Sequence, residues 1–399
     1  MRIALLTMTE PAGTGQPFPR AFLRVAGASL ARHQLGLALA LDCQRVICLA
    51  RGTSSELIAL QHAAEDAGLQ FAIATSAQQL ARFVNATDEL VVVSEGLFAE
   101  PTHAVPLLDG SLPTVLVQPV EGALAAGFER IDLNRAGAGV MRIPGALAER
   151  LHELPPDCDV ASALMRIALQ AGAQMREVPA AARGATEWRM IRSEAEAFAL
   201  ETAWLKARFA DGPTSPGRAL ARRGVLSFGA SLLHAGNASN ALSLAVLALL
   251  ALAGGLGRFG FVWAGFLLAG GAWVVAEASR LLRSTERRAL GQLPPAIPRA
   301  NLLDFLADVV FALLILADSP RFAGETTVSW LCAPAILILL LSLLPRMLRG
   351  NAKRWIGDRL VLGLVLAGAT AAGVVLPVTQ LLSVALIVLG LVLSAKPSS

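Results

Sequence analysis

Two aspartates, Asp304 and Asp308, stand inside an otherwise apolar stretch of the sequence. Their spacing puts them on one face of a helix, one turn apart. Placing a carboxylate in hydrocarbon costs roughly 2.5–3.5 kcal/mol on insertion scales, so such a pair points to a functional site. Two interpretations are open. The pair binds a divalent cation and takes part in chemistry, or it forms salt bridges with Arg280 or Arg299 near the helix ends.

A second set of residues with chemical potential follows the first apolar run, Arg2–Met8. Gly13 and Gly15 lie in the loop after this run, and Arg20 follows them. Glycines let backbone amides approach a phosphate, and an arginine supplies a cation for it. A lone Gly-x-Gly is also typical of a simple turn, so the loop is a candidate phosphate-binding segment and no more than that.

Short apolar strands and helices alternate along residues 1–210. We expect these residues to form the first domain. The predicted strands cover residues 2–8, 45–50, 70–74, 89–93 and 114–118, and the predicted helices cover 29–40, 54–67 and 77–84. This order predicts an α/β domain with a mostly parallel sheet and helices on both faces. Ligands of such sheets bind at the carboxyl ends of the strands, which favours the loop after the first strand.

The second half of the chain is far more apolar than the first. A Pro- and Gly-containing linker and an amphipathic helix occupy residues 211–236, and residues 237–399 are expected to form an all-α, six-helix transmembrane domain. The six predicted spans are 238–256, 259–280, 302–317, 328–345, 360–376 and 378–394. Three segments on one side of these spans hold 13 basic residues, against Arg258 and Arg321 on the other side. We therefore expect both termini to be cytoplasmic.

The net charge of +4 does not indicate nucleic-acid binding, because the arginines concentrate beside the apolar segments. The four cysteines show no paired metal-ligand spacing. In a cytosolic or membrane setting they are expected to be reduced packing residues.

The stretch from Arg280 to Asp308 resembles the motif of CDP-alcohol phosphotransferases, D-x2-D-G-x2-A-R-x8-9-G-x3-D-x3-D. Ala300-x3-Asp304-x3-Asp308 matches its end, and Arg280 matches its arginine. In that register Ala272 and Val275 stand where the first two aspartates belong, and the connecting loop is about ten residues longer than the motif allows. The frame is retained, whereas half of the metal-binding carboxylates are missing.

This resemblance implies a site in which Asp304 and Asp308 bind Mg²⁺ or Mn²⁺, Asp308 is the general base and Arg280 lies near the substrate. It further implies a CDP-linked or lipid substrate, contact with membrane lipids and a homodimer. The implied location is a bacterial-type inner (cytoplasmic) membrane, with the protein crossing it several times.

Residues 12–30 resemble the nucleotide-binding loop of sugar-nucleotide and cytidylyl transferases, in which G-x-G-T-R is followed by P-K and V-x-G-x-P-L. Pro19-Arg20 and the run from Val25 to Leu30 match the later parts. The resemblance implies that Gly13, Gly15 and Arg20 bind substrate. The loop arginine of the pattern is replaced by Gln16.

The same family has acidic residues at three further positions, which can be compared with this sequence. Glu95 stands where the family has a metal-binding aspartate, and it is either a ligand or a solvated loop residue. Met190 and Arg192 stand at the two acidic positions after Trp188. A guanidinium at such a position occupies the place of the cation. We therefore expect the transferase fold without ordinary metal-dependent nucleotidyl transfer.

Together the halves resemble fused enzymes that activate inositol phosphate with CTP and then transfer it. One hypothesis is a divergent membrane transferase of phospholipid or inositol-phosphodiester synthesis that uses Asp304 and Asp308. The other is a catalytically inactive relative that binds a nucleotide, a lipid or a partner enzyme. A transporter is less favoured, because the sequence has no evident internal repeat.

Overall fold

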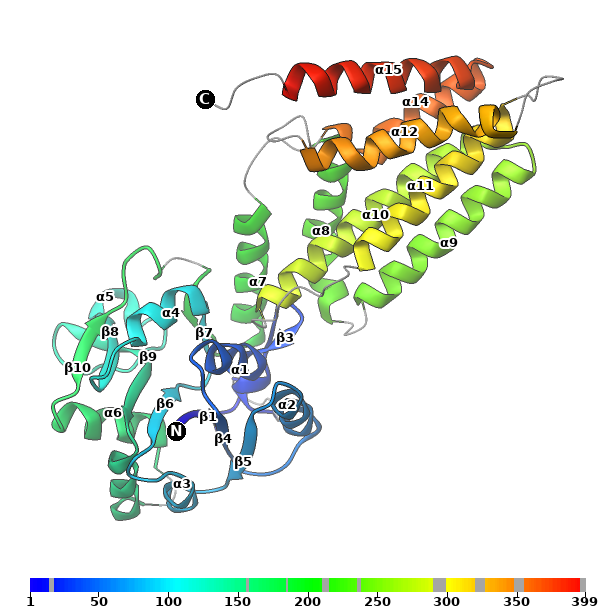
Figure 1. Cartoon of the computed structure of the whole chain (residues 1–399). Coiled ribbons are helices and arrows are strands. Elements are labelled where there is room, and N and C mark those ends of the chain that lie inside the picture. The colour runs from blue at the N-terminus through cyan, green and yellow to red at the C-terminus, as the bar shows by residue number, and fades with distance from the viewer. Residues whose placement is uncertain are drawn as a thin grey trace. The chain divides into compact units, whose positions relative to one another are not determined.

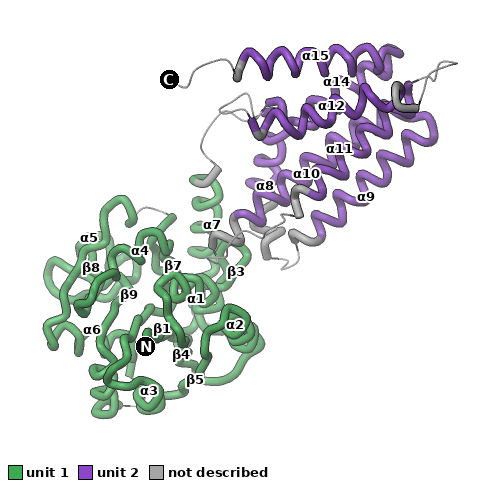
Figure 2. The backbone as a smooth tube through the Cα atoms, in the orientation of Figure 1, with its two compact units in different colours: residues 1–208, 285–293 green, residues 209–284, 294–399 purple. Residues whose placement is uncertain are grey.

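The structure is a computed structural model that describes residues 1–13, 18–155, 158–183, 186–209, 215–234, 238–289, 299–319, 327–347 and 355–394. Gly15 lies outside these residues, as does the side chain of Arg299. The chain forms two compact units, residues 1–208 with 285–293 and residues 209–284 with 294–399 (Figure 2).

A seven-stranded sheet forms the centre of the N-terminal unit, with the strand order β10-β8-β9-β6-β1-β4-β5 (Figure 1). Its strands are β1 (Arg2–Met8), β4 (Arg45–Ala50), β5 (Gln70–Ala74), β6 (Glu89–Val93), β8 (Thr114–Pro119), β9 (Arg135–Pro144) and β10 (Gln174–Glu177). β1 is parallel to β4 and β6, and β9 is antiparallel to β6 and β8. The predicted α/β domain with a mostly parallel sheet is confirmed.

Helices cover both faces of this sheet. They are α1 (Leu30–Ala40), α2 (Ser55–Asp66), α3 (Ala77–Phe83), α4 (Pro101–Leu108), α5 (Val120–Ala123), α6 (Val160–Gln170) and the 3-10 segments η1 (Arg20–Phe22) and η2 (Gly145–Glu153). Alternate residues of β1 join different cores. Ala4 and Leu6 pack on the side of α1, α2 and α4, whereas Ile3 and Leu5 pack on the side of α3, η2 and α6.

The helices that follow the predicted strands begin at serine caps. The hydroxyls of Ser29, Ser54 and Ser76 each accept a bond from the backbone N–H three residues later. Such a cap satisfies one of the N–H groups that a helix leaves open at its start. α1, α2 and α3 therefore start within a residue or two of their predicted positions.

Two small sheets join distant parts of the chain to this core. β2 (Arg24–Val25) pairs with β3 (Ala28–Ser29), and β7 (Leu97–Ala99) pairs with β11 (Trp188–Met190). The indole N–H of Trp188 donates to the carbonyl of Ala138 at 2.9 Å. The segment after β11 is thereby held beside the end of β6.

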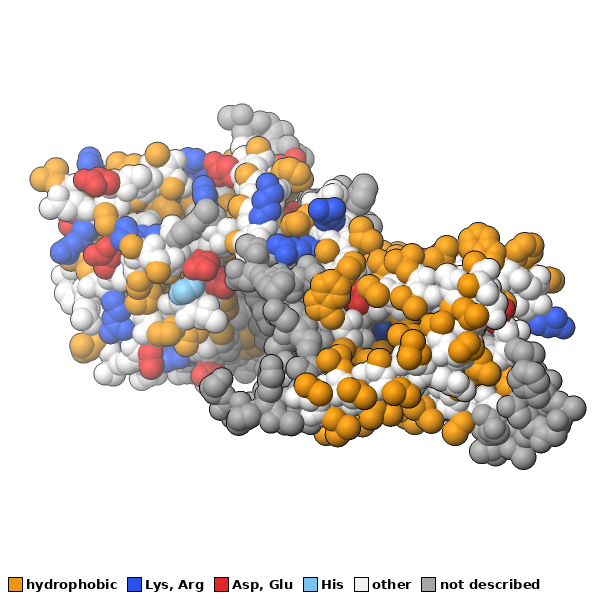
Figure 3. Space-filling view, turned by 90° about the horizontal axis from the view of Figure 1, so that it is seen from above, with side chains coloured by type: hydrophobic (Ala, Val, Ile, Leu, Met, Phe, Trp, Pro, Cys, Tyr) orange, Lys and Arg blue, Asp and Glu red, His pale blue; other side chains and the backbone are white. Residues whose placement is uncertain are grey.

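The C-terminal unit consists of helices in the part of the chain that the structure describes. After α7 (Glu194–Phe209) they are α8 (Pro216–His234), α9 (Ala238–Arg258), α10 (Val262–Ala289), α11 (Arg299–Asp318), α12 (Thr327–Met347), α14 (Arg359–Ala371) and α15 (Val375–Ser394). Among the described residues, three stretches are long and apolar enough to cross a membrane, Ala241–Arg258, Val262–Ser284 and Val375–Val392. Hydrophobic side chains gather on the surface of this unit (Figure 3). Six spans and cytoplasmic termini stay predictions.

The start of α8 is fixed to the start of α14. Asp358 accepts bonds from the N–H groups of Leu360 and Val361 and so caps α14. Its other oxygen accepts the N–H of Gly217 at 2.7 Å. A Cβ on Gly217 would lie 2.5 Å from an Asp358 oxygen and 2.9 Å from the ring of Trp273, so this contact requires a glycine.

Candidate functional site

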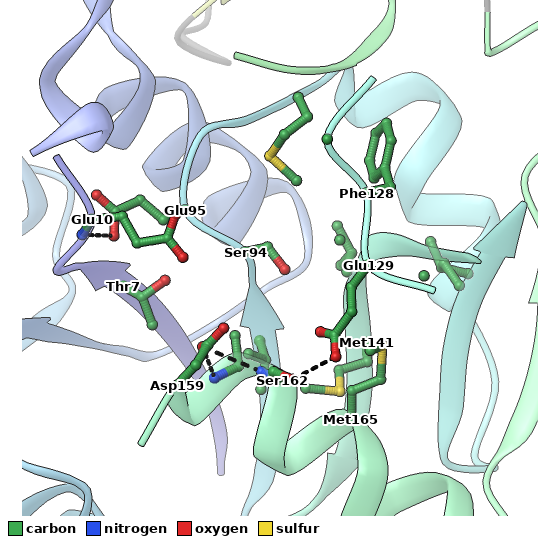
Figure 4. Close-up of a pocket in the computed structure, with 18 of the residues that line it drawn as sticks. Thr7, Glu10, Ser94, Glu95, Phe128, Glu129, Met141, Asp159, Ser162 and Met165 are labelled. Carbon is green, nitrogen blue, oxygen red and sulfur yellow. Dashed lines mark hydrogen bonds between the residues drawn. The ribbon is translucent and has the colours of Figure 1, made fainter. Parts of the chain in front are cut away.

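A cavity of about 370 Å³ lies in the N-terminal unit at the carboxyl ends of β1 and β6. β1 connects through α1 to β4 on one side, whereas β6 lies on its other side. Ligands of open α/β sheets bind at such a point, where the order in which successive strands are added to the sheet reverses. Thr7 at the end of β1 and Ser94 just after β6 line the cavity (Figure 4). Thr9, just after β1, lines it too. The cavity therefore borders the loop that the sequence singles out.

Glu95 fastens this loop to the end of β6. Its side chain is buried, and one carboxylate oxygen accepts the backbone N–H of Thr9 at 2.6 Å and that of Glu10 at 2.9 Å. The other oxygen accepts the N–H of Ala21 at 3.3 Å. The interpretation of Glu95 as a solvated loop residue is wrong. Its oxygens face backbone amides, which also makes it a poor metal ligand.

Burial raises the pKa of Glu95 from 4.5 to about 7, because the charged form loses its hydration. Hydrogen bonds donated by the backbone N–H groups of Glu10, Thr9 and Ala21 lower this pKa, and the nearby Glu10 carboxylate raises it. Glu95 therefore titrates close to neutral pH, at a position that holds the wall of the cavity.

Of the three predicted loop residues, the structure brings Arg20 to the cavity. Its guanidinium forms an ion pair with Glu10, with 2.6 Å between Nη2 and Oε2. Gly13, which has a φ of +86°, donates its N–H to the carbonyl of Pro11 and is not among the residues that line the cavity. Gly15 lies outside the described residues, so its predicted role stays a prediction.

Glu129 and Asp159 also line the cavity, and neither is indicated by the sequence (Figure 4). Glu129 accepts the hydroxyl of Ser162 at 2.6 Å and the guanidinium of Arg166 at 2.9 Å. Asp159 caps α6 through the N–H groups of Ala161 and Ser162. An aspartate just before an apolar helical run signals a cap, but nothing in the local sequence places that cap at a cavity.

Arg192 reaches the cavity from the segment after β11, and Met190 lines it as well. Nε and Nη2 of Arg192 donate to Glu196, with 2.8 Å from Nη2 to Oε1, and its backbone N–H donates to Glu196 Oε2 at 2.8 Å. Nη2 also donates to the carbonyl of Ala125 at 3.3 Å. The two positions that the sequence marks as altered metal positions therefore lie in the wall of the cavity.

No protein-family model matches this sequence, and no curated protein sequence matches it significantly. Solved structures similar to its N-terminal half include a candidate glucose-1-phosphate thymidylyltransferase from Bacillus anthracis in complex with sucrose (14% identity, TM-score 0.40, 51% of this chain and 94% of that chain). Another is the inositol-1-phosphate CTP transferase from T. maritima (14% identity, TM-score 0.37, 52% of this chain and 96% of that chain). Neither alignment identifies a ligand for this chain.

Three carboxylates of the C-terminal unit, Glu277, Asp304 and Asp308, are paired with arginines. Arg280 donates to Asp304 at 2.6 Å and also pairs with Glu277, which in turn pairs with Arg218 at 3.1 Å. The salt bridge between Asp304 and Arg280 agrees with the second interpretation of the acidic pair. This chain of charges joins α8, α10 and α11.

Asp308 has a different partner, Arg359 at the start of α14. Both side chains are buried, and Nε and Nη2 of the arginine each donate to one carboxylate oxygen at 3.0 Å. Nη2 also donates to the carbonyl of Leu341 in α12, and Nη1 to that of Gly357. One guanidinium thereby connects α11, α12 and α14.

These carboxylates do not fit a divalent cation as they stand. Both oxygens of Asp308 and one oxygen of Asp304 are taken by guanidinium groups, which carry the positive charge that a metal supplies. Among the described residues, no group of three or more His, Cys, Asp or Glu side chains is placed to hold a metal ion. The predicted roles of Asp304, Asp308 and Arg280 stay predictions.

Proposed function

We propose that this chain is a membrane-anchored binding protein whose N-terminal domain binds a nucleotide or nucleotide-linked ligand and does not carry out metal-dependent transfer. The observation that carries the proposal is the cavity of about 370 Å³ where the chain changes direction between β1 and β6. A cavity of this size suits a small organic ligand. The resemblance of residues 12–30 to nucleotide-binding loops supplies the ligand class.

The lining of the cavity combines apolar and polar side chains. Phe128, Met165 and Met190 contribute apolar side chains, against which a flat base can pack. Thr9 and Ser94 contribute hydroxyl groups that can bond to a sugar. An apolar wall with a few polar groups is typical of sites for organic cofactors and nucleotides.

The role proposed for the C-terminal domain follows from its ion pairs. The resemblance to CDP-alcohol phosphotransferases supports a multi-pass domain in a bacterial-type inner membrane, with cytoplasmic termini and a homodimeric assembly. Because Arg359 binds both oxygens of Asp308, this carboxylate is not placed to take a proton from an acceptor hydroxyl. We therefore propose that this domain anchors the ligand-binding domain.

The alternative is divergent phosphoalcohol transfer with Asp304 and Asp308, in phospholipid or inositol-phosphodiester synthesis. One oxygen of Asp304 is buried and has no hydrogen-bond partner among the described residues, so it could accept a further bond. This function requires Arg359 to release Asp308, and it predicts turnover that depends on Mg²⁺ or Mn²⁺.

The experiment is the melting temperature of the full-length protein in detergent, with CDP or CTP, in EDTA and in Mg²⁺ or Mn²⁺. A ligand that binds only the folded state adds ~2.7 kcal/mol at 100 times its dissociation constant. We expect stabilisation in EDTA that is retained in Asp308→Asn. Thr9→Trp fills the cavity and should abolish it, whereas Thr102→Trp, at an exposed position of α4, should not.

Stabilisation that requires a divalent cation and disappears in Asp308→Asn but not in Thr9→Trp would support the transferase instead. No stabilisation by any nucleotide would refute both nucleotide functions.

A further inference from the structure

Two arginines from distant parts of the sequence reach the cavity. The side chain of each passes close to a glycine whose backbone is in the left-handed region. Gly96 has a φ of +82°, and a Cβ there would lie 2.8 Å from Cδ of Arg20. Gly127 has a φ of +92°, and a Cβ there would lie 2.9 Å from Cδ of Arg192. A side chain at either position would meet the arginine and strain the backbone. Both glycines therefore leave the space through which an arginine enters the cavity.

Each arginine is oriented by a glutamate. Arg20 is held by Glu10 through Nη2, and Arg192 is held by Glu196 through Nε and Nη2. The carbonyl of Ala125 accepts a further bond from Arg192. Guanidinium groups fixed in this way lose little freedom when a ligand binds, which favours affinity.

Several donors that line the cavity are not used within the described part of the chain. Nη1 of Arg192 has no bond to a described residue. Thr7, Thr9 and Ser94, which carry hydroxyl groups, line the same cavity. Nε of Arg20 also lacks a partner among the described residues but is buried from solvent, so the guanidinium ends and the hydroxyls are the donors that a ligand can meet. These donors favour a ligand that brings acceptors.

The carboxylates that line the cavity are already engaged. Glu10 is paired with Arg20, and Glu95 accepts three backbone N–H groups. One oxygen of Glu129 accepts from Ser162 and from Arg166, and one oxygen of Asp159 caps α6. Glu10, Glu129 and Asp159 each keep a second oxygen that has no bond to a described residue, and the lining carries more acidic than basic residues. The positive charge available to a ligand in this cavity therefore comes from Arg20 and Arg192.

We propose that Arg20 and Arg192 form an anion subsite that binds a phosphate or diphosphate group without a divalent metal ion. The subsite deepens the proposed function, on which it rests, because the phosphate belongs to the nucleotide-class ligand. A guanidinium binds phosphate oxygens through a planar fork of N–H groups and is always charged. Arg192 thereby supplies, at this position, the positive charge that a bound metal ion would otherwise supply to the phosphate.

The test compares CDP with the neutral nucleoside cytidine on the full-length protein in detergent, in EDTA, by calorimetric titration. We expect Arg192→Gln to weaken CDP by about 10- to 100-fold, the range for charge-assisted hydrogen bonds, and to leave cytidine unchanged. Arg192→Lys keeps the charge but not the fork, so it should lie between the wild type and Arg192→Gln. Arg183→Gln, which removes an arginine paired with Glu177 elsewhere in the same unit, is the matched control and should change neither affinity.

The melting temperature of each variant without ligand shows that it is folded. CDP binding that is lost in EDTA overturns the subsite but leaves the nucleotide-binding function standing. Equal CDP affinity in the wild type and Arg192→Gln also overturns the subsite alone, as does an equal loss of CDP and cytidine. If the wild type binds neither compound, the subsite and the proposed function both fall.

Discussion

Replacing Glu95 with glutamine should change how the stability of the N-terminal unit depends on pH. Folding raises the pKa of this carboxyl from 4.5 to about 7. Between these values the folded state keeps a proton that the unfolded state has released, so stability falls as pH rises. The contribution is fully present below pH 4.5 and is lost as pH passes through about 7. At ~1.36 kcal/mol per unit, the loss amounts to about 3 kcal/mol.

The amide of Glu95→Gln does not titrate, so the variant should gain about 3 kcal/mol relative to the wild type between pH 4.5 and pH 8. Hydrogen exchange of the β1 amides in the full-length protein measures this gain, because comparison at equal pH cancels the intrinsic exchange rates. About 3 kcal/mol corresponds to a change of roughly 100-fold in the ratio of exchange rates. Glu153→Gln, at an exposed position in η2, is the matched control and should show a constant ratio.

Two effects compete at Glu95, and the sign of the result decides between them. Loss of hydration disfavours the carboxylate, whereas the three backbone N–H groups favour it. A ratio that stays constant from pH 4.5 to pH 8 would show that the two effects cancel. If the wild type becomes more stable than Glu95→Gln as pH rises, the hydrogen bonds from the three backbone N–H groups stabilise the carboxylate more than burial destabilises it. Either result refutes the raised pKa.

Two further predictions concern buried contacts. Arg359→Leu leaves Asp308 buried without its partner and should cost about 3–5 kcal/mol in thermal or chemical unfolding in detergent, whereas the double variant with Asp308→Leu should cost much less. An equal cost for both would show that the ion pair is not what stabilises this point. Gly96→Ala should cost more than Gly68→Ala, because both glycines have a φ of +82° but only Gly96 has Ile191 O, at 2.5 Å, in the way of a Cβ. Strain at such a φ alone costs about 1–3 kcal/mol, so equal costs would contradict the close contact.

Strands β1, β4, β5, β6 and β8 and helices α1, α2 and α3 could be predicted from the sequence because their signals are local. Short apolar runs bounded by polar turns mark β1, β4, β5 and β6, and serine caps mark the helices between them. The position of β9 between β6 and β8, antiparallel to both, could not be predicted. Strand order is set by contacts between distant residues, which no local pattern specifies.

The candidate site shows the same limit. Arg20 could be found because it follows a recognisable loop, whereas Glu129 and Asp159 become cavity residues only when α6 packs against the sheet. The charge of Asp308 is visible in the sequence, but its partner Arg359 lies 51 residues away. Identity and spacing therefore located the charged groups, and tertiary packing decided which of them neutralise one another.

The bond from Gly217 to Asp358 bears on where the polypeptide can be divided. The first candidate membrane-spanning helix begins at Ala238, so a separately produced C-terminal half could be started there. A chain that starts there lacks the whole of α8 and leaves one oxygen of the buried Asp358 without its donor. Ser215, which is fully buried, would be missing too. A C-terminal half intended for separate study should therefore begin before Ser215.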